Sequence, residues 1–201
     1  DGGLLRILAA DGRFPTVAIP GTLTVTLGRG ATLELNGLRL HGGGIAVQGS
    51  ATDPGTLVLR DCTLVPGLDL DRRGDATAPG AVSVQIGTTG MALVCERVIS
   101  GPVQLMSDAE AIFTDCILDA GSDAAAALFA PPGSVRHVVS LTRCTVRGRV
   151  STGSFSGSAG IDAAGGAPAT SDTLFMGAAP GIEAAMRQTG CIRFSLVPPG
   201  A

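Results

Sequence analysis

The densest group of residues that could do chemistry is the stretch LDLDRRGD, residues 68–75. Asp69, Asp71 and Asp75 supply the hard carboxylate oxygens that Ca²⁺ binds in proteins, and Arg72 places a guanidinium group beside them. The stretch lacks the glycine-centred twelve-residue loop of an EF-hand. We interpret it as a solvated surface loop, with a Ca²⁺ or catalytic site at these four residues as the alternative.

The remaining candidates are more scattered. Asp108, Glu110, Asp115 and Asp119 form a thin acidic group, for which solvated turn positions are the simpler interpretation. Neither His41 nor His137 has a Cys, Asp or Ser at the spacing of a known motif.

The sequence also lacks the common motifs of hydrolases, metalloproteases and phosphate sites. It contains no GxSxG and no HExxH, and the GGG at 42–44 precedes a strand pattern instead of a helix, unlike a phosphate loop. No cofactor is therefore predicted, apart from Ca²⁺ in the alternative above.

Composition excludes two further classes of partner. All 14 basic residues are Arg, the net charge is −3, no basic cluster is present and aromatics make up 3%, so we expect no nucleic-acid binding. No apolar run approaches the roughly 18 residues of a membrane span, and the start lacks the features of a signal peptide. The chain begins without Met, and its first residues already follow the strand pattern of the later sequence. We therefore expect a processed chain or an excised fragment.

A pattern of two short strands separated by a two-residue break recurs along the chain. Apolar residues occupy positions 1, 3, 6 and 8 of each repeat, as Leu57, Leu59, Cys62 and Leu64 do. Related repeats lie at 33–40, 111–118 and 139–146, and a degenerate one lies at 93–98. Period 2 is typical of a half-buried strand, and the break keeps the apolar faces of both strands toward one interior.

The repeat gives three of the five cysteines the same position. Cys62, Cys116 and Cys144 are predicted to lie in one inward column, as small apolar side chains just after the break. Cys95 and Cys191 fall elsewhere, and no CxxC pair indicates a zinc or redox site.

The break itself separates two interpretations. Asn36-Gly37 alone predicts a hairpin, because this pair suits a type I′ turn. The equivalent pairs, such as Arg60-Asp61 and Thr142-Arg143, would strain a turn that needs positive φ at both positions. A corner with one left-handed residue is favoured, and a third short strand follows at 45–47, 82–86 and 103–105. Spacings near roughly 20–30 residues with variable loops indicate a solenoid of stacked coils.

This pattern resembles the right-handed parallel β-helices of the pectin-lyase-like superfamily, over about residues 4–150. The resemblance implies three parallel sheets joined by corners. It also implies how such a fold acts on acidic glycans: the lyases combine a calcium cluster with an Arg or Lys base, and the hydrolases use clustered Asp residues. The segment GCIRFSLVPPG, 190–200, resembles more weakly an uncharacterised bacterial family associated with phage-tail-like contractile injection clusters.

The pattern fades after residue 150. Residues 151–172 are rich in Gly, Ala and Ser and predict a flexible loop. TLFMG, 173–177, predicts one more strand, and GIEAAMRQTG, 181–190, predicts a short helix ending at Gly190. Within one domain of 1–201, we interpret 173–201 as a C-terminal helical cap that covers the open end of the solenoid.

Three functions fit these observations. The first is a non-catalytic structural or binding module, for example within a larger assembly, whose stacked face carries a protein partner or a glycan. The second is a polysaccharide lyase or glycoside hydrolase acting at Asp69, Asp71, Arg72 and Asp75. The third is self-association through an uncovered first coil at Leu4, Leu5, Ile7 and Leu8, which is compatible with the first.

Overall fold

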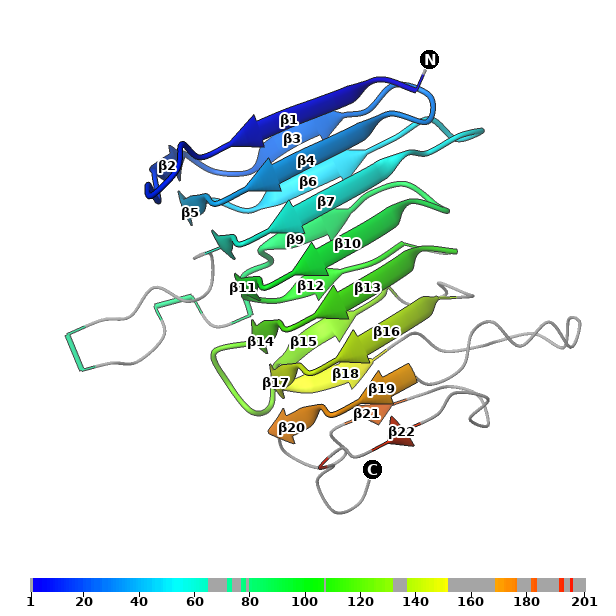
Figure 1. Cartoon of the computed structure of the whole chain (residues 1–201). Coiled ribbons are helices and arrows are strands. Elements are labelled where there is room, and N and C mark those ends of the chain that lie inside the picture. The colour runs from blue at the N-terminus through cyan, green and yellow to red at the C-terminus, as the bar shows by residue number, and fades with distance from the viewer. Residues whose placement is uncertain are drawn as a thin grey trace, which may run out of the picture.

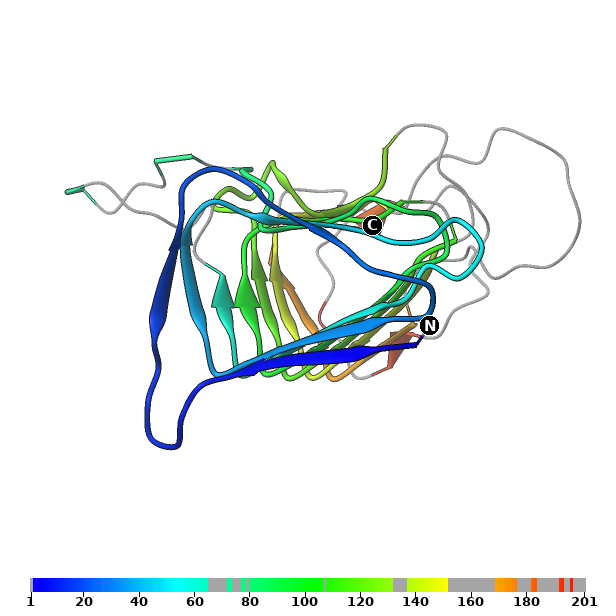
Figure 2. The ribbon, with the colours of Figure 1, turned by 90° about the horizontal axis from the view of Figure 1, so that it is seen from above.

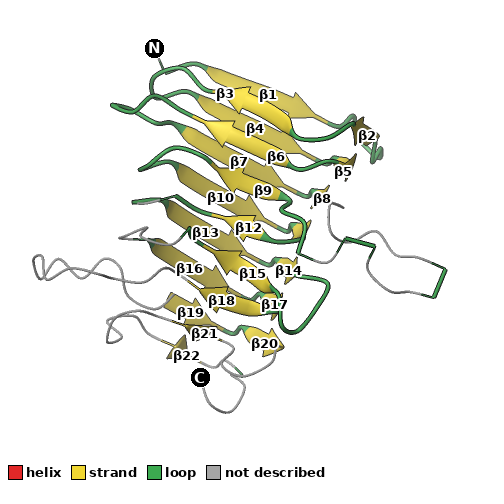
Figure 3. Cartoon of the chain, turned by 180° about the vertical axis from the view of Figure 1, so that it is seen from behind, coloured by secondary structure: helices red, strands yellow, loops and turns green. Residues whose placement is uncertain are grey.

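The computed structural model describes residues 2–64, 72–73, 77–78, 80–106, 108–131, 137–151, 169–176, 182–183, 192–193 and 196. Over these residues the chain is all-β, and Figure 3 shows strands and loops with no helix. No helix in the described part is long and apolar enough to cross a membrane.

The strands form three parallel sheets. The first sheet contains, in order, β1 (Leu4–Leu8), β4 (Thr32–Asn36), β7 (Thr56–Arg60), β10 (Ala92–Glu96), β13 (Glu110–Thr114), β16 (Val138–Thr142), β19 (Ala169–Ser171) and β22 (Ile192–Arg193). The second contains β2 (Thr16–Ile19), β5 (Arg39–Gly42), β8 (Thr63–Leu64), β11 (Ile99–Ser100), β14 (Ile117–Asp119), β17 (Thr145–Arg147) and β20 (Leu174–Met176). The third contains β3 (Leu23–Thr26), β6 (Ile45–Gln48), β9 (Val84–Ile86), β12 (Val103–Gln104), β15 (Ala126–Phe129), β18 (Arg149–Ser151) and β21 (Ile182–Glu183).

The chain visits the three sheets in turn, so each pass of three strands is one coil stacked on the one before (Figure 1). Every strand pairs in parallel with the equivalent strands of the neighbouring coils, for example Leu57 with Leu33 on one side and Leu93 on the other. The view along the stack shows the sheets enclosing one interior (Figure 2). The predicted β-solenoid is confirmed, and the hairpin alternative is wrong because the strands flanking each break belong to different sheets.

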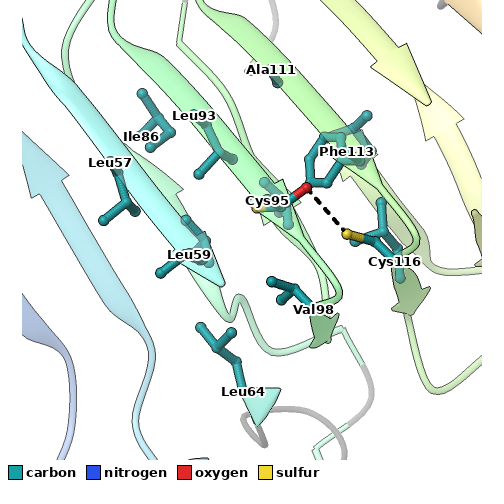
Figure 4. Packing of buried hydrophobic residues seen from close by; sticks show 14 of the residues in the cluster. Leu57, Leu59, Leu64, Ile86, Leu93, Cys95, Val98, Ala111, Phe113 and Cys116 are labelled. Carbon is teal, nitrogen blue, oxygen red and sulfur yellow. Dashed lines mark hydrogen bonds between the residues drawn. The ribbon is translucent and has the colours of Figure 1, made fainter. Parts of the chain in front are cut away.

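The interior is filled by aliphatic columns that run from coil to coil. The inward residues of the repeat, such as Leu57, Leu59 and Leu64, are fully buried. Figure 4 shows them pointing into the space between the sheets together with Cys95 and Phe113. With so few aromatics, the core consists of stacked Leu, Val, Ile, Ala and Cys, each covered by its equivalent in the next coil.

The corner between the first and second sheets is formed by one left-handed residue, as expected. The second residue of every break has positive φ: 73° at Gly37, 50° at Asp61, 53° at Arg97, 57° at Asp115 and 53° at Arg143. Asp tolerates this conformation better than most residues, but two of the five positions are Arg. The ion pairs described below involve both of these arginines.

The predicted C-terminal helix is not seen. Ile182 and Glu183, inside the predicted 181–190 helix, form strand β21, which pairs with β18 through Val150 and Ile182. Backbone pairing with the preceding coil overrides the local helical pattern at these two residues. Residues 181 and 184–190 lie outside the described residues, as do residues 152–168 of the predicted loop, while Leu174–Met176 of TLFMG form the predicted strand as β20.

Candidate functional site

Most of the acidic stretch that the sequence singles out lies outside the described residues. This holds for Asp69, Asp71 and Asp75, so the structure does not place the predicted Ca²⁺ or catalytic group. Arg72, the remaining member, lies in an exposed turn.

The structure separates the second acidic group. Glu110 begins β13 and Asp115 follows its far end, so the rise of an extended strand puts them about 16 Å apart. Asp119 accepts a hydrogen bond from the Gly121 amide at 2.7 Å, and Asp108 lies in an exposed turn with φ 56°. Within the described residues, no three His, Cys, Asp or Glu side chains are grouped so as to hold a metal ion.

The two histidines occupy opposite environments. His41 lies exposed on β5. His137 is 2% exposed, directly before β16, and neither imidazole nitrogen has a hydrogen-bond partner among the described residues. Burial lowers the pKa of His137, while the nearby Asp108 carboxylate acts in the opposite direction. His137 is therefore a neutral side chain of the interior.

The cysteine column has a polar role that the sequence interpretation missed. Each thiol donates to the carbonyl two residues earlier, at the break: Cys62 to Arg60 at 3.1 Å, and Cys116 to Thr114 at 3.2 Å. Each also lies 3.5 Å from a carbonyl of the preceding coil, and Figure 4 marks this contact between Cys116 and Cys95.

Later members of the same column repeat the arrangement. Cys144 donates to Thr142 at 3.3 Å, and Thr173 places a hydroxyl in the same position, 3.0 Å from the Ser171 carbonyl. Burial raises the pKa of the Cys62 thiol, so it stays protonated and can donate. The column reads Leu38, Cys62, Val98, Cys116, Cys144 and Thr173, so four of its six members add a side-chain donor to a corner carbonyl. Cys191 lies outside the described residues.

Oppositely charged residues alternate along the corner between the first and second sheets. Arg97 makes a bidentate pair with Asp61 of the preceding coil, at 2.6 and 2.8 Å. Arg143 pairs with Asp115 in the same way, at 2.7 and 2.8 Å. These hydrogen bonds lower the pKa of both carboxyl groups. Asp172 takes the next corner position, with φ 53°, and we call this series the corner ladder.

A second alternating series, the outer ladder, lies on the outer face of the first sheet. Glu34 is 6% exposed and accepts from Arg6 Nε at 2.7 Å and from Arg60 Nη1 at 2.8 Å. Arg60 Nε in turn donates to Glu96 at 3.1 Å. The order along the stack is therefore Arg6, Glu34, Arg60, Glu96, with opposite charges in successive coils.

The first coil differs in exposure from the five coils that follow it. Leu5 is 60% exposed although Leu33, its partner in the next coil, is 4% exposed. Ile7 and Val17 are likewise 47% and 42% exposed in rows that are buried further along. The candidate functional site is this N-terminal end, where three strand edges surround uncovered aliphatic side chains.

The corner ladder could have been found by aligning the repeats, whereas the outer ladder crosses from the row of Arg6 and Glu34 to the row of Arg60 and Glu96. The aligned breaks read Asp61, Arg97, Asp115 and Arg143 in order, and this alternation of sign in coil order is the signal. Leu4, Leu5, Ile7 and Leu8 were expected to form this uncovered coil; Leu5 and Ile7 lie in the inward rows, whereas Leu4 and Leu8 lie on the outward face of β1.

Comparisons of the chain with protein-family models, with curated proteins and with solved structures find no match.

Proposed function

We propose that the chain is a non-catalytic β-solenoid module of a larger protein assembly, in which further polypeptide covers its first described coil. One observation carries the proposal: the first coil exposes Leu5, Ile7 and Val17, which belong to rows that the next five coils bury. An uncovered apolar end surrounded by strand edges is a typical protein-interaction surface.

The charged residues of the described surface support a structural role. Glu34, Asp61 and Asp115 are all engaged by arginines of neighbouring coils. Such pairs hold adjacent coils in register, and they leave these carboxylates already occupied.

The handedness of the solenoid and its relation to known families belong to the same proposal. Seen from the N-terminal end in Figure 2, the chain turns clockwise as it moves away from the viewer. This direction supports a right-handed solenoid. Kinship with pectin-lyase-like β-helices, and with the phage-tail-like family through residues 190–200, stays a prediction from the sequence.

A panel of acidic polysaccharides, including polygalacturonate and alginate, tests the non-catalytic part. The folded chain, incubated with and without Ca²⁺, is expected to release neither unsaturated nor reducing ends. Cleavage of any uronan that is lost in an Asp69→Ala, Asp71→Ala variant would overturn the proposal in favour of a lyase or hydrolase.

An apolar dye tests the open end. The parent chain is expected to bind the dye more strongly than a Leu5→Ser, Ile7→Ser variant, because these changes remove apolar surface exposed at the end of the stack. Equal dye binding would mean that this surface is covered in solution, and would remove the basis of the proposed docking.

A further inference from the structure

We infer that Cys116 and Cys144 form a two-thiolate binding site for the soft metal ion Cu(I), held in a line between two neighbouring coils. The site lies in the middle of the stack and is independent of the proposed function. Three properties of the pair point to it: the equivalent positions of the two cysteines, the spacing of the coils and the effect of each thiol on the ionisation of the other.

The two cysteines are direct neighbours in the cysteine column. Ile117 of β14 pairs with Thr145 of β17, so the residues just before them, Cys116 and Cys144, occupy equivalent positions of adjacent coils. They are 1% and 3% exposed. Each thiol donates to the carbonyl two residues earlier, so both sulfurs have the same orientation below the corner.

The spacing of the coils matches a linear metal dithiolate. Neighbouring strands of a sheet lie about 4.7–4.9 Å apart, so two equivalent side chains with the same orientation place their sulfurs about one such step apart. A metal–thiolate bond is about 2.3 Å long, so an ion with one sulfur on each side spans about 4.6 Å. An ion between Cys116 and Cys144 therefore requires little movement of either coil.

Each thiol changes the acidity of the other. Interaction with the Cys116 thiol lowers the pKa of Cys144, and the same interaction raises the pKa of Cys116. Cys144 is therefore the first of the two to lose its proton, while Cys116 keeps its own and donates it toward the thiolate. The charged side chains next to them, Asp115 and Arg143, form a bidentate pair and offset each other.

Cu(I) takes the place of the remaining proton. Binding to the singly ionised pair forms two Cu–S bonds, breaks the Cys116 S–H bond and releases that proton to water, so the pair keeps one negative charge. No oxidation state changes, and soft thiolate ligands favour Cu(I). Zn²⁺ is disfavoured, because a structural zinc site takes four ligands and the described residues offer no group of three.

Anaerobic titration with Cu(I) against a chromogenic chelator tests the site. A Cys191→Ser background removes the one cysteine outside the described residues. We expect one Cu(I) per chain and a higher melting temperature when it is bound, because the ion binds the folded chain and joins two coils. Zn²⁺ is expected to leave the melting temperature unchanged, and an equal rise with Zn²⁺ would overturn the two-coordinate assignment.

Replacement by Ser identifies the ligands. Thr173 shows that a hydroxyl fits this column, because it donates to a corner carbonyl as the cysteines do. Cys116→Ser and Cys144→Ser are therefore expected to fold like the parent, which the melting temperature without metal checks. Each is expected to abolish Cu(I) binding, since one thiolate is left. If either variant binds Cu(I) as tightly as the parent, the inference is wrong.

Cys62→Ser is the matched control. Cys62 makes the same carbonyl contact in the same column, but Val98 separates it from Cys116. This variant is expected to bind Cu(I) like the parent, and loss of binding would show that the assigned pair is not the site.

A gain of function tests the stacking rule itself. Val98→Cys places a thiol between Cys62 and Cys116, in register with both. We expect at least one further Cu(I) per chain, which is lost again when Cys62→Ser is added. A folded Val98→Cys variant that still binds a single ion would show that stacked thiols do not make a Cu(I) site in this column.

Discussion

The first coil and the third coil carry the same pattern of side chains but lie in different surroundings. Leu5 and Leu57 occupy one inward row of the first sheet, and Ile7 and Leu59 occupy another. Leu5 and Ile7 are about half exposed, whereas Leu57 and Leu59 are completely buried. Burial in this protein therefore comes from the neighbouring coils and not from the coil to which a residue belongs.

The largest expected difference between the two regions follows from a buried charge. Cys116→Arg places a guanidinium in an inward column among closely stacked coils, and we expect it to destabilise the protein by more than about 4 kcal/mol. Val17→Arg changes an inward residue of the first coil, from which the side chain reaches water, and is expected to be mild. Thermal unfolding measures both; a Cys116→Arg variant that melts like the parent would show that the inward assignment is wrong.

Truncation of one row gives a finer comparison. Leu59→Ala is expected to cost about 2–5 kcal/mol, because the closely packed coils on both sides leave a cavity. Ile7→Ala, in the same row at the open end, is expected to cost less than about 1 kcal/mol, since its side chain is already half in water. Urea denaturation gives both values, and similar losses at the two positions would contradict the comparison.

The outer ladder links the two regions. Glu34→Gln weakens charge-assisted hydrogen bonds to Arg6 of the first coil and Arg60 of the third, so we expect a loss of about 1–3 kcal/mol. Glu110→Gln, at an exposed strand start, is the matched control and is expected to change stability by less than about 0.5 kcal/mol. Indistinguishable variants in urea denaturation would mean that the ladder contributes nothing to stacking.

The smallest expected effect depends on pH and concerns the interior alone. Because burial lowers the pKa of His137, the unfolded chain binds a proton more readily than the folded one. His137 therefore does not destabilise the folded protein above the unfolded pKa of about 6.5. Its destabilising effect grows as the pH falls through that value toward the lowered pKa of the folded state. Met91 occupies the same row two coils earlier, so His137→Met keeps an apolar fit.

Thermal melts at pH 7.5 and pH 5.5 measure this contribution. The parent is expected to lose more stability between the two pH values than His137→Met does. An equal loss in both proteins would show that His137 does not titrate differently in the folded and unfolded states.

The fold could be predicted from the sequence because the same short spacing of apolar residues recurs from coil to coil. The spacing of Leu57, Leu59, Cys62 and Leu64 predicts two strands, a corner and an inward face, and the structure confirms all three. Period-2 patterning works well here because every strand has one face in the interior.

The features that the sequence interpretation missed depend on contacts between coils. The pairing of Asp61 with Arg97 needs the register of residues 36 positions apart. The strand at Ile182–Glu183 is decided by β18 rather than by its helix-favouring neighbours. The site at Asp69, Asp71 and Asp75 stays a prediction, because its residues lie outside the described part of the chain.

The corner ladder limits how such a protein can change in length during evolution. Deleting the coil that carries Arg97 would place Asp61 beside Asp115, and deleting the one that carries Asp115 would place Arg97 beside Arg143. Either change replaces an attraction with a repulsion at a strained corner, whereas deleting two adjacent coils restores the alternation. Along this corner, duplication or loss of gene segments is favourable in even numbers of coils.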